Sequence, residues 1–152
     1  MGPLRFVYSP SAWLWLCVLA ILASSTACSH QPRYSAPPLI GQDVAIELTS
    51  LEADVPRFFT YRHDGKNISF FVLRLPNKTL SFLDACVTCY PRKLGYRYQD
   101  GFVHCRACDV NFSVFKLERG IGGCYPIQLK GRTENGRYLI RLADLEQHAG
   151  KF

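Results

Sequence analysis

Five cysteines in the second half of the chain are the residues whose types and spacing could do chemistry. Two C-x2-C pairs are separated by fifteen residues, and a fifth cysteine follows after fifteen more. Two intervening residues let one tight turn aim both sulfurs of a pair at a single ion, so two such turns side by side form a tetrahedral thiolate site. We refer to residues 86–89 as the first knuckle and to residues 105–108 as the second. The spacing predicts a metal site made of Cys86, Cys89, Cys105 and Cys108.

The sequence alone leaves other uses of these thiols open. Structural disulfides suit an oxidising compartment, although five thiols leave one unpaired and a bridge within a C-x2-C pair closes a loop too short to gain much stability. A thioredoxin-like pair needs a helix N-terminus to lower the pKa of one thiol, and neither "CVTCYP" nor "CRACDV" has a clear strand-to-helix context. A thiol-disulfide oxidoreductase, or a disulfide-stabilised structural protein without metal, is therefore the alternative.

Cys124 is a candidate cofactor-binding residue. It lies in "GIGGCYPI", where two glycines let the backbone approach a site closely or adopt positive φ. It could replace one of the four ligands, act as a fifth thiol, or be a plain buried cysteine. Cations outnumber anions between the first knuckle and Cys124, and nearby cations favour thiolates. The charged residues of this stretch are Arg92, Lys93, Arg97, Arg106, Lys116 and Arg119 against Asp100, Asp109 and Glu118.

Short strands joined by tight turns are expected to position the cysteines. From Asp43 onward, runs of aromatic and β-branched residues alternate with turn signals. Asp64-Gly65 and Asp100-Gly101 supply the positive φ angles of two-residue hairpins, and the second hairpin leads directly into the second knuckle. "GRYLIRL" predicts a later strand, followed by a short helix over residues 143–148. We predict a mainly β fold with a minor α component, a small β-hairpin domain whose paired knuckles are like those of zinc ribbons and rubredoxins.

The N-terminal residues predict export. Arg5 precedes an apolar run over residues 12–23, and small residues follow it, which is the organisation of a signal peptide. Twelve apolar residues are fewer than the roughly 20 that span a bilayer, although an uncleaved anchor is the alternative. Cys28 directly follows Ser25-Thr26-Ala27, which fits either a signal-peptidase site or a bacterial lipoprotein box with Cys28 lipidated.

The chain divides into a signal peptide over residues 1–27, a tether over residues 28–42 and a cysteine-rich metal-binding domain over residues 43–152. The tether mixes Pro, Ser and Gly without apolar periodicity. With 48% hydrophobic and 20% charged residues, the remainder has enough apolar side chains for one core. We expect a membrane-attached protein on the periplasmic or cell-surface face of a bacterium, where it would not meet nucleic acid.

No catalytic constellation is visible. Asp84 and Asp109 flank cysteines, but neither has a His or Ser partner placed by a motif. Both are expected to be turn or cap residues, and we do not predict an enzyme.

Four stretches in their order resemble one known family. They are "FFTYRHDGKNISFFVLRL", "LDACVTCY", "GYRYQDGFVHCRACDVNF" and "GIGGCYPIQL". Together they resemble the FtrD-like family, described as membrane iron-sulfur-containing proteins, over roughly Asp43 to Leu142. The resemblance implies that the five cysteines match those of the family and that the cofactor is an iron-sulfur cluster. Zn²⁺ is the alternative, because an exposed thiolate set outside the cell would readily take it. The resemblance also implies electron transfer or iron handling beside a bacterial iron-transport system, with an iron permease as partner.

Overall fold

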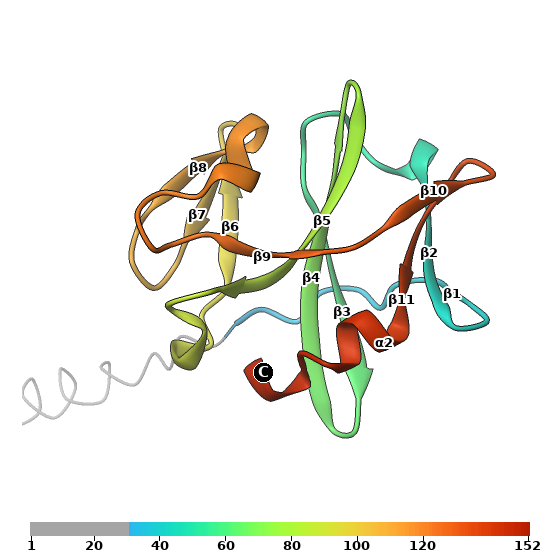
Figure 1. Cartoon of the computed structure of the whole chain (residues 1–152), viewed down its shortest axis with the longest axis horizontal. Coiled ribbons are helices and arrows are strands. Elements are labelled where there is room, and N and C mark those ends of the chain that lie inside the picture. The colour runs from blue at the N-terminus through green and yellow to red at the C-terminus, as the bar shows by residue number, and fades with distance from the viewer. Residues whose placement is uncertain (1–30) are drawn as a thin grey trace, which may run out of the picture.

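Three small antiparallel sheets make up the described part of the chain, residues 31–152 of the computed structural model (Figure 1). The first sheet contains, in order, β1 (Leu39–Ile40), β2 (Asp43–Glu47), β11 (Arg137–Arg141) and β10 (Arg132–Glu134). The second contains β3 (Arg57–His63), β4 (Lys66–Leu75), β5 (Lys78–Cys86) and β9 (Pro126–Leu129). The third contains β6 (Tyr96–Gln99), β7 (Phe102–Cys105) and β8 (Asn111–Ser113).

Helical structure in residues 31–152 consists of short segments. They are the helix α2 (Leu142–Glu146) and the 3₁₀ segments η1 (Leu48–Ser50), η2 (Tyr90–Arg92), η3 (Val114–Arg119) and η4 (Ala149–Lys151). The predicted mainly β fold with a minor α component is thereby confirmed. Within residues 31–152, no helix is long and apolar enough to cross a membrane. The predicted signal peptide and Cys28 lie outside the described residues.

Two-residue hairpins form where Asp-Gly pairs predict them. Asp64-Gly65 connects β3 to β4, and Asp100-Gly101 connects β6 to β7. Both residues of each pair have positive φ, as a turn that matches the twist of its strands requires. A third turn of this kind, Asn135-Gly136, joins β10 to β11. Sequence reasoning did not single it out, although Asn-Gly is an equally strong signal.

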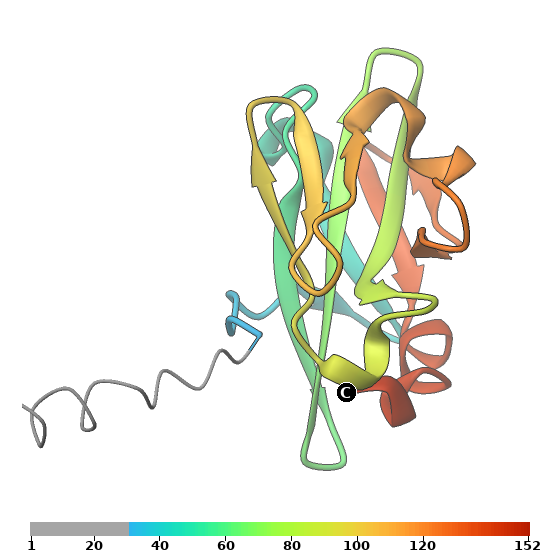
Figure 2. The same ribbon diagram turned by 90° about the vertical axis from the view of Figure 1, so that its left-hand side faces the viewer.

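The two central strands of the second sheet, β4 and β5, are buried on both faces. Successive residues of β4 point into two different cores: Phe70 and Val72 pack with the first sheet, whereas Phe71 and Leu73 pack with the third. Figures 1 and 2 show the resulting layers, with the third sheet on one side of β4 and β5 and the first sheet on the other. Double burial explains why "NISFFVLRL" and "LSFLDAC" read as nearly continuous apolar runs.

Residues 31–42, most of the predicted tether, contact the domain. The Tyr34 amide donates to Thr60 Oγ1 over 3.0 Å, and the Thr60 amide donates to the Ser35 carbonyl oxygen over 3.1 Å. The Tyr34 ring stacks on Phe58 with centroids 4.9 Å apart. The domain boundary at Asp43 stays a prediction, but this segment runs along the edge strand β3 and leads toward the cysteines.

An ion pair at the start of β2 predicts a small acid sensitivity. The Arg132 guanidinium donates two hydrogen bonds to the Asp43 carboxylate, over 3.1 and 2.8 Å, and thereby holds the pKa of Asp43 below its usual value. A depressed carboxyl pKa adds stability at neutral pH, and that stability is lost as the pH falls through the folded-state pKa. We expect Asp43→Asn to lower the Tm by a few degrees at most at pH 7, because the pair is partly exposed.

Thermal unfolding at several pH values checks this expectation. The Tm difference between Asp43→Asn and the wild type should shrink as the pH falls through the lowered pKa of Asp43, because the wild-type carboxyl then also becomes neutral. A difference independent of pH would contradict the role assigned to the ion pair.

Candidate metal centre

Two strand ends and one loop bring the five cysteines together. β5 ends at Cys86, and the first knuckle turns from there into η2. β7 ends at Cys105, and the second knuckle follows before β8. β9 pairs with β5 so that Pro126 lies opposite Cys86, and this register carries Cys124 to the first knuckle.

The sulfurs form one continuous group, which we refer to as the five-cysteine cluster. The Sγ atoms of Cys86, Cys89 and Cys124 all lie within 4.8 Å of one another, as do those of Cys89, Cys105 and Cys108. The Sγ atoms of Cys108 and Cys124 are 3.7 Å apart. Four sulfurs at about 2.3 Å from one metal ion would be separated by about 3.8 Å. The cluster therefore has nearly the spacing that a shared metal requires, and all five thiols are free in the described part of the chain.

Backbone amides point at the first sulfur of each knuckle in the same pattern. In both knuckles, the amides two and three residues further along the chain donate to that sulfur. The donors are Thr88 and Cys89 for Cys86, and Ala107 and Cys108 for Cys105. Hydrogen bonds to a sulfur favour its charged form, and the thiolate is the form that binds metal. Each tight turn therefore orients two sulfurs and also supports a thiolate.

The thiol pKa values differ between the positions. At Cys86, burial opposes ionisation, but the amides outweigh burial and the pKa lies below its usual value. At Cys105, burial prevails and raises the pKa to about 11. Burial and the Cys108 thiol also raise the pKa of Cys89 and that of Cys124. The pKa of Cys108 is lowered although burial opposes this, because the Val110 amide and neighbouring thiols donate to its sulfur. Several thiolates in contact repel one another, so a cation is needed for all of them to be charged.

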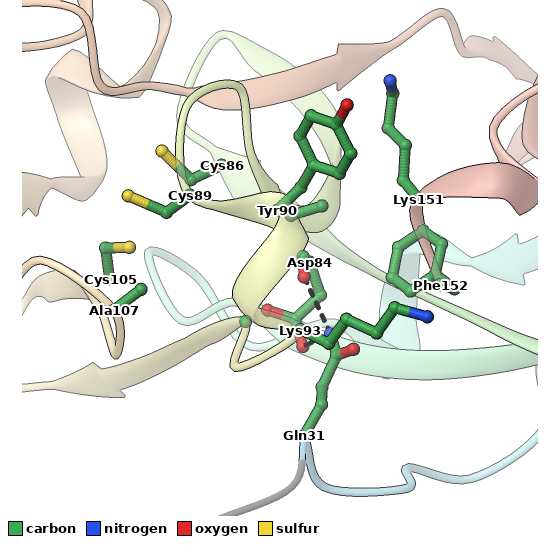
Figure 3. Close-up of a pocket in the computed structure, with 12 residues that line it drawn as sticks. Gln31, Asp84, Cys86, Cys89, Tyr90, Lys93, Cys105, Ala107, Lys151 and Phe152 are labelled. Atoms are coloured by element: carbon green, nitrogen blue, oxygen red, sulfur yellow. Dashed lines mark hydrogen bonds between the residues drawn. The ribbon is translucent and has the colours of Figure 1, made fainter.

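A buried carboxylate, Asp84, lies directly behind the first knuckle. Its side chain is 1% exposed in β5. One oxygen accepts the Tyr96 amide over 2.5 Å, and the other accepts Gln31 Nε2 over 2.7 Å. Burial raises the pKa of Asp84 to about 6, although these donors act in the opposite direction. Figure 3 shows the sulfurs of Cys86, Cys89 and Cys105 grouped on one side, with Asp84 and Gln31 joined on the other.

The expectation that Asp84 is a turn or cap residue is wrong. It is a strand residue that holds the start of β6 and the N-terminal segment against the first knuckle. The signal for this role was a charged residue inside a continuous apolar run, since a buried charge requires partners. Asp109, by contrast, does lie in the turn after the second knuckle, with a φ of 56°.

Two of the basic residues near the cysteines hold the second knuckle against residues 92–96, which follow the first knuckle. Arg92 Nη1 donates to the Ala107 carbonyl oxygen over 2.7 Å. The Arg106 amide donates to the Gly95 carbonyl oxygen over 3.0 Å, and its Nε donates to the Tyr96 carbonyl oxygen over 2.9 Å. These bonds stabilise the relative position of the two C-x2-C turns, on which a shared metal depends.

The donor set fits a soft metal. All five candidate ligand atoms are sulfur, which is the ligation of iron-sulfur clusters and of structural zinc. Four of the cysteines are those that the spacing predicts, and Cys124 joins them through long-range pairing.

A family model described as membrane iron-sulfur containing protein FtrD-like matches residues 51–152, which include all five cysteines. Comparison with curated proteins gives no match.

Proposed function

The chain belongs to the FtrD-like family of membrane iron-sulfur-containing proteins, and we propose on this premise that the five-cysteine cluster holds an iron-sulfur centre. The proposed ligands are the four knuckle cysteines, with Cys124 as a fifth thiol beside them. The main observation behind this proposal is the convergence of two knuckles in which paired amides point at the first sulfur. When bound, an iron-sulfur centre supplies one-electron transfer. We propose that the protein transfers electrons or handles iron for a bacterial iron-transport system.

The burial of the cysteines supports a site with one protected and one accessible side. Cys86 and Cys105 are buried in the core between the second and third sheets, where apolar side chains exclude water. Cys108 is exposed, and the exposed side chains of Ile121 and Tyr125 lie near Cys124 in sequence. A partner protein can approach this side, so we propose that electrons or iron pass here.

The N-terminal segment supports a position close to the membrane. Gln31 bonds to Asp84, two residues before Cys86, and only three peptide units separate Gln31 from Cys28. Three extended residues span about 10 Å. If export leaves a lipid on Cys28, or if the preceding apolar run stays as an anchor, the metal centre lies near the lipid surface. This placement suits an iron permease as the partner.

Metal and sulfide analysis of the full chain tests the proposal. The protein should be purified without oxygen from a native envelope, and its visible spectrum recorded before and after reduction. We expect the protein to contain iron and inorganic sulfide, and its visible absorbance to bleach on reduction. A colourless protein with stoichiometric zinc would contradict electron transfer and make the cluster a structural site.

The distance of 3.7 Å between the Cys108 and Cys124 sulfurs favours a second candidate function. Two thiols this close can be oxidised to a disulfide, as a metal-free thiol-disulfide protein requires. Alkylation of free thiols in the denatured, non-reduced protein distinguishes the two candidates. Oxidised pairs with no bound metal would support this second candidate, whereas reactive thiols at all five cysteines of the cluster and bound iron would exclude it.

A further inference from the structure

We propose that the Tyr96 hydroxyl donates a hydrogen bond to the Cys86 sulfur when that sulfur binds metal, and that this bond raises the reduction potential of the site. The inference rests on the proposed function, because it requires a metal on Cys86. Tyr96 would then be a positioning residue that acts through a ligand.

Tyr96 is a buried polar side chain without a partner. It begins β6 and is 0% exposed. Within residues 31–152, its Oη is buried and has no hydrogen-bond partner. Buried hydroxyl groups are nearly always bonded, since an unbonded one loses its interaction with water and gains nothing in return. The unpartnered hydroxyl therefore indicates a neighbouring group that becomes a good acceptor only in another state of the site.

The ring of Tyr96 is held in place from several sides. It packs edge-on against Phe71 and Phe112, with centroids 6.1 and 6.2 Å away. Its backbone amide donates to Asp84, and its carbonyl oxygen accepts Arg106 Nε. Because the backbone and the ring are both held, the ring cannot move to expose its hydroxyl to water.

Cys86 is the group beside this hydroxyl. Tyr96 and Cys86 pack in the same core, and the Tyr96 hydroxyl faces the Cys86 sulfur. A neutral thiol is a weak acceptor, whereas a thiolate is a strong one. We therefore expect the hydrogen bond to form when a metal holds Cys86 as a thiolate.

The electronic consequence has a definite sign. A hydrogen bond to a ligand sulfur withdraws negative charge from the metal site and stabilises the reduced state more than the oxidised state. Loss of the bond should make the reduction potential more negative. The effect of Tyr96→Phe on stability depends on whether metal is bound. Without metal, Tyr96→Phe removes an unsatisfied buried group, and with metal it removes a hydrogen bond.

Tyr96→Phe in the full chain tests the proposal, with Tyr138→Phe as the matched control. Tyr138 is also buried, but it packs in the other core and its Oη bonds to Ser81 Oγ over 3.1 Å. Tyr96→Phe should keep its iron, show a more negative potential by protein voltammetry, and lose Tm only in the metal-loaded form. Tyr138→Phe should lose Tm with and without metal and keep the wild-type potential. A Tyr96→Phe protein with the wild-type potential would overturn the proposal.

A second measurement separates this proposal from the proposed function. If the native protein holds zinc, electron transfer fails, but Tyr96 can still bond to a metal-bound Cys86. Metal-free protein would then be titrated with Co²⁺, whose thiolate charge-transfer absorption reports on the sulfurs. Tyr96→Phe should bind Co²⁺ more weakly than Tyr138→Phe and shift this absorption. Equal affinity and an unchanged spectrum in the two variants would overturn the proposal.

Discussion

Cys86→Ala should abolish metal binding and remove the stability that the metal supplies, whereas Cys124→Ala should keep the metal. Cys86 is buried at the end of β5 and accepts two backbone amides, so its thiolate is the best supported of the five. Cys124 is only half-buried, and its pKa is raised by burial and by the Cys108 thiol. A metal present at 1,000 times its Kd stabilises a fold by about 4 kcal/mol. The free energy of unfolding of the Cys86→Ala protein should be lower than that of the metal-loaded wild type by about this amount.

Metal content and urea unfolding of the two full-length variants measure this difference. Both should be compared with the wild type in the loaded and in the metal-free form. The metal-free proteins should differ little, because alanine at Cys86 leaves only a small cavity. If Cys124→Ala lost metal as completely as Cys86→Ala, Cys124 would be a ligand and one of the knuckle cysteines would be the free fifth thiol.

Gly95→Ala should destabilise the protein much more than Gly65→Ala, although both glycines have positive φ, 63° and 74°. A Cβ at position 65 would meet no atom within 4 Å, so that variant has only the backbone cost of roughly 1–2 kcal/mol. A Cβ at position 95 would lie 2.6 and 2.7 Å from the two Asp84 carboxylate oxygens. Displacing this carboxylate breaks hydrogen bonds to a buried charge, which adds roughly 1–3 kcal/mol.

The effect of Gly95→Ala should extend to metal binding. The Gly95 carbonyl oxygen accepts the Arg106 amide from the second knuckle, so a shift at Gly95 separates the two turns. Urea unfolding of metal-free protein gives the stability difference, and Co²⁺ titration gives the metal affinity. If Gly95→Ala and Gly65→Ala matched in both measurements, the bonds of Asp84 would not contribute to the stability of the knuckles.

The hairpins and knuckles could be predicted from the sequence because each depends on a few neighbouring residues. Asp64-Gly65 and Asp100-Gly101 predict their turns because the positive φ angles that they adopt depend on those residues and their immediate neighbours. C-x2-C spacing likewise determines how two sulfurs on one turn are oriented. The mainly β fold followed from the apolar runs, and the family from the order of the cysteine motifs. Both are confirmed.

Long-range pairing decided the features that the sequence left open. Cys124 reaches the knuckles because β9 pairs with β5 across 40 residues, from Cys86 to Pro126. Gln31 bonds to Asp84 across 53 residues, and Tyr96 lies beside Cys86 because the third sheet packs on the second. None of these contacts has a local signature, since each forms only when separate strands meet in one core. The sequence by itself determined two thiol turns whose sulfur donors suit a soft metal, and the tertiary structure added the fifth sulfur, the buried carboxylate and the unbonded hydroxyl around them.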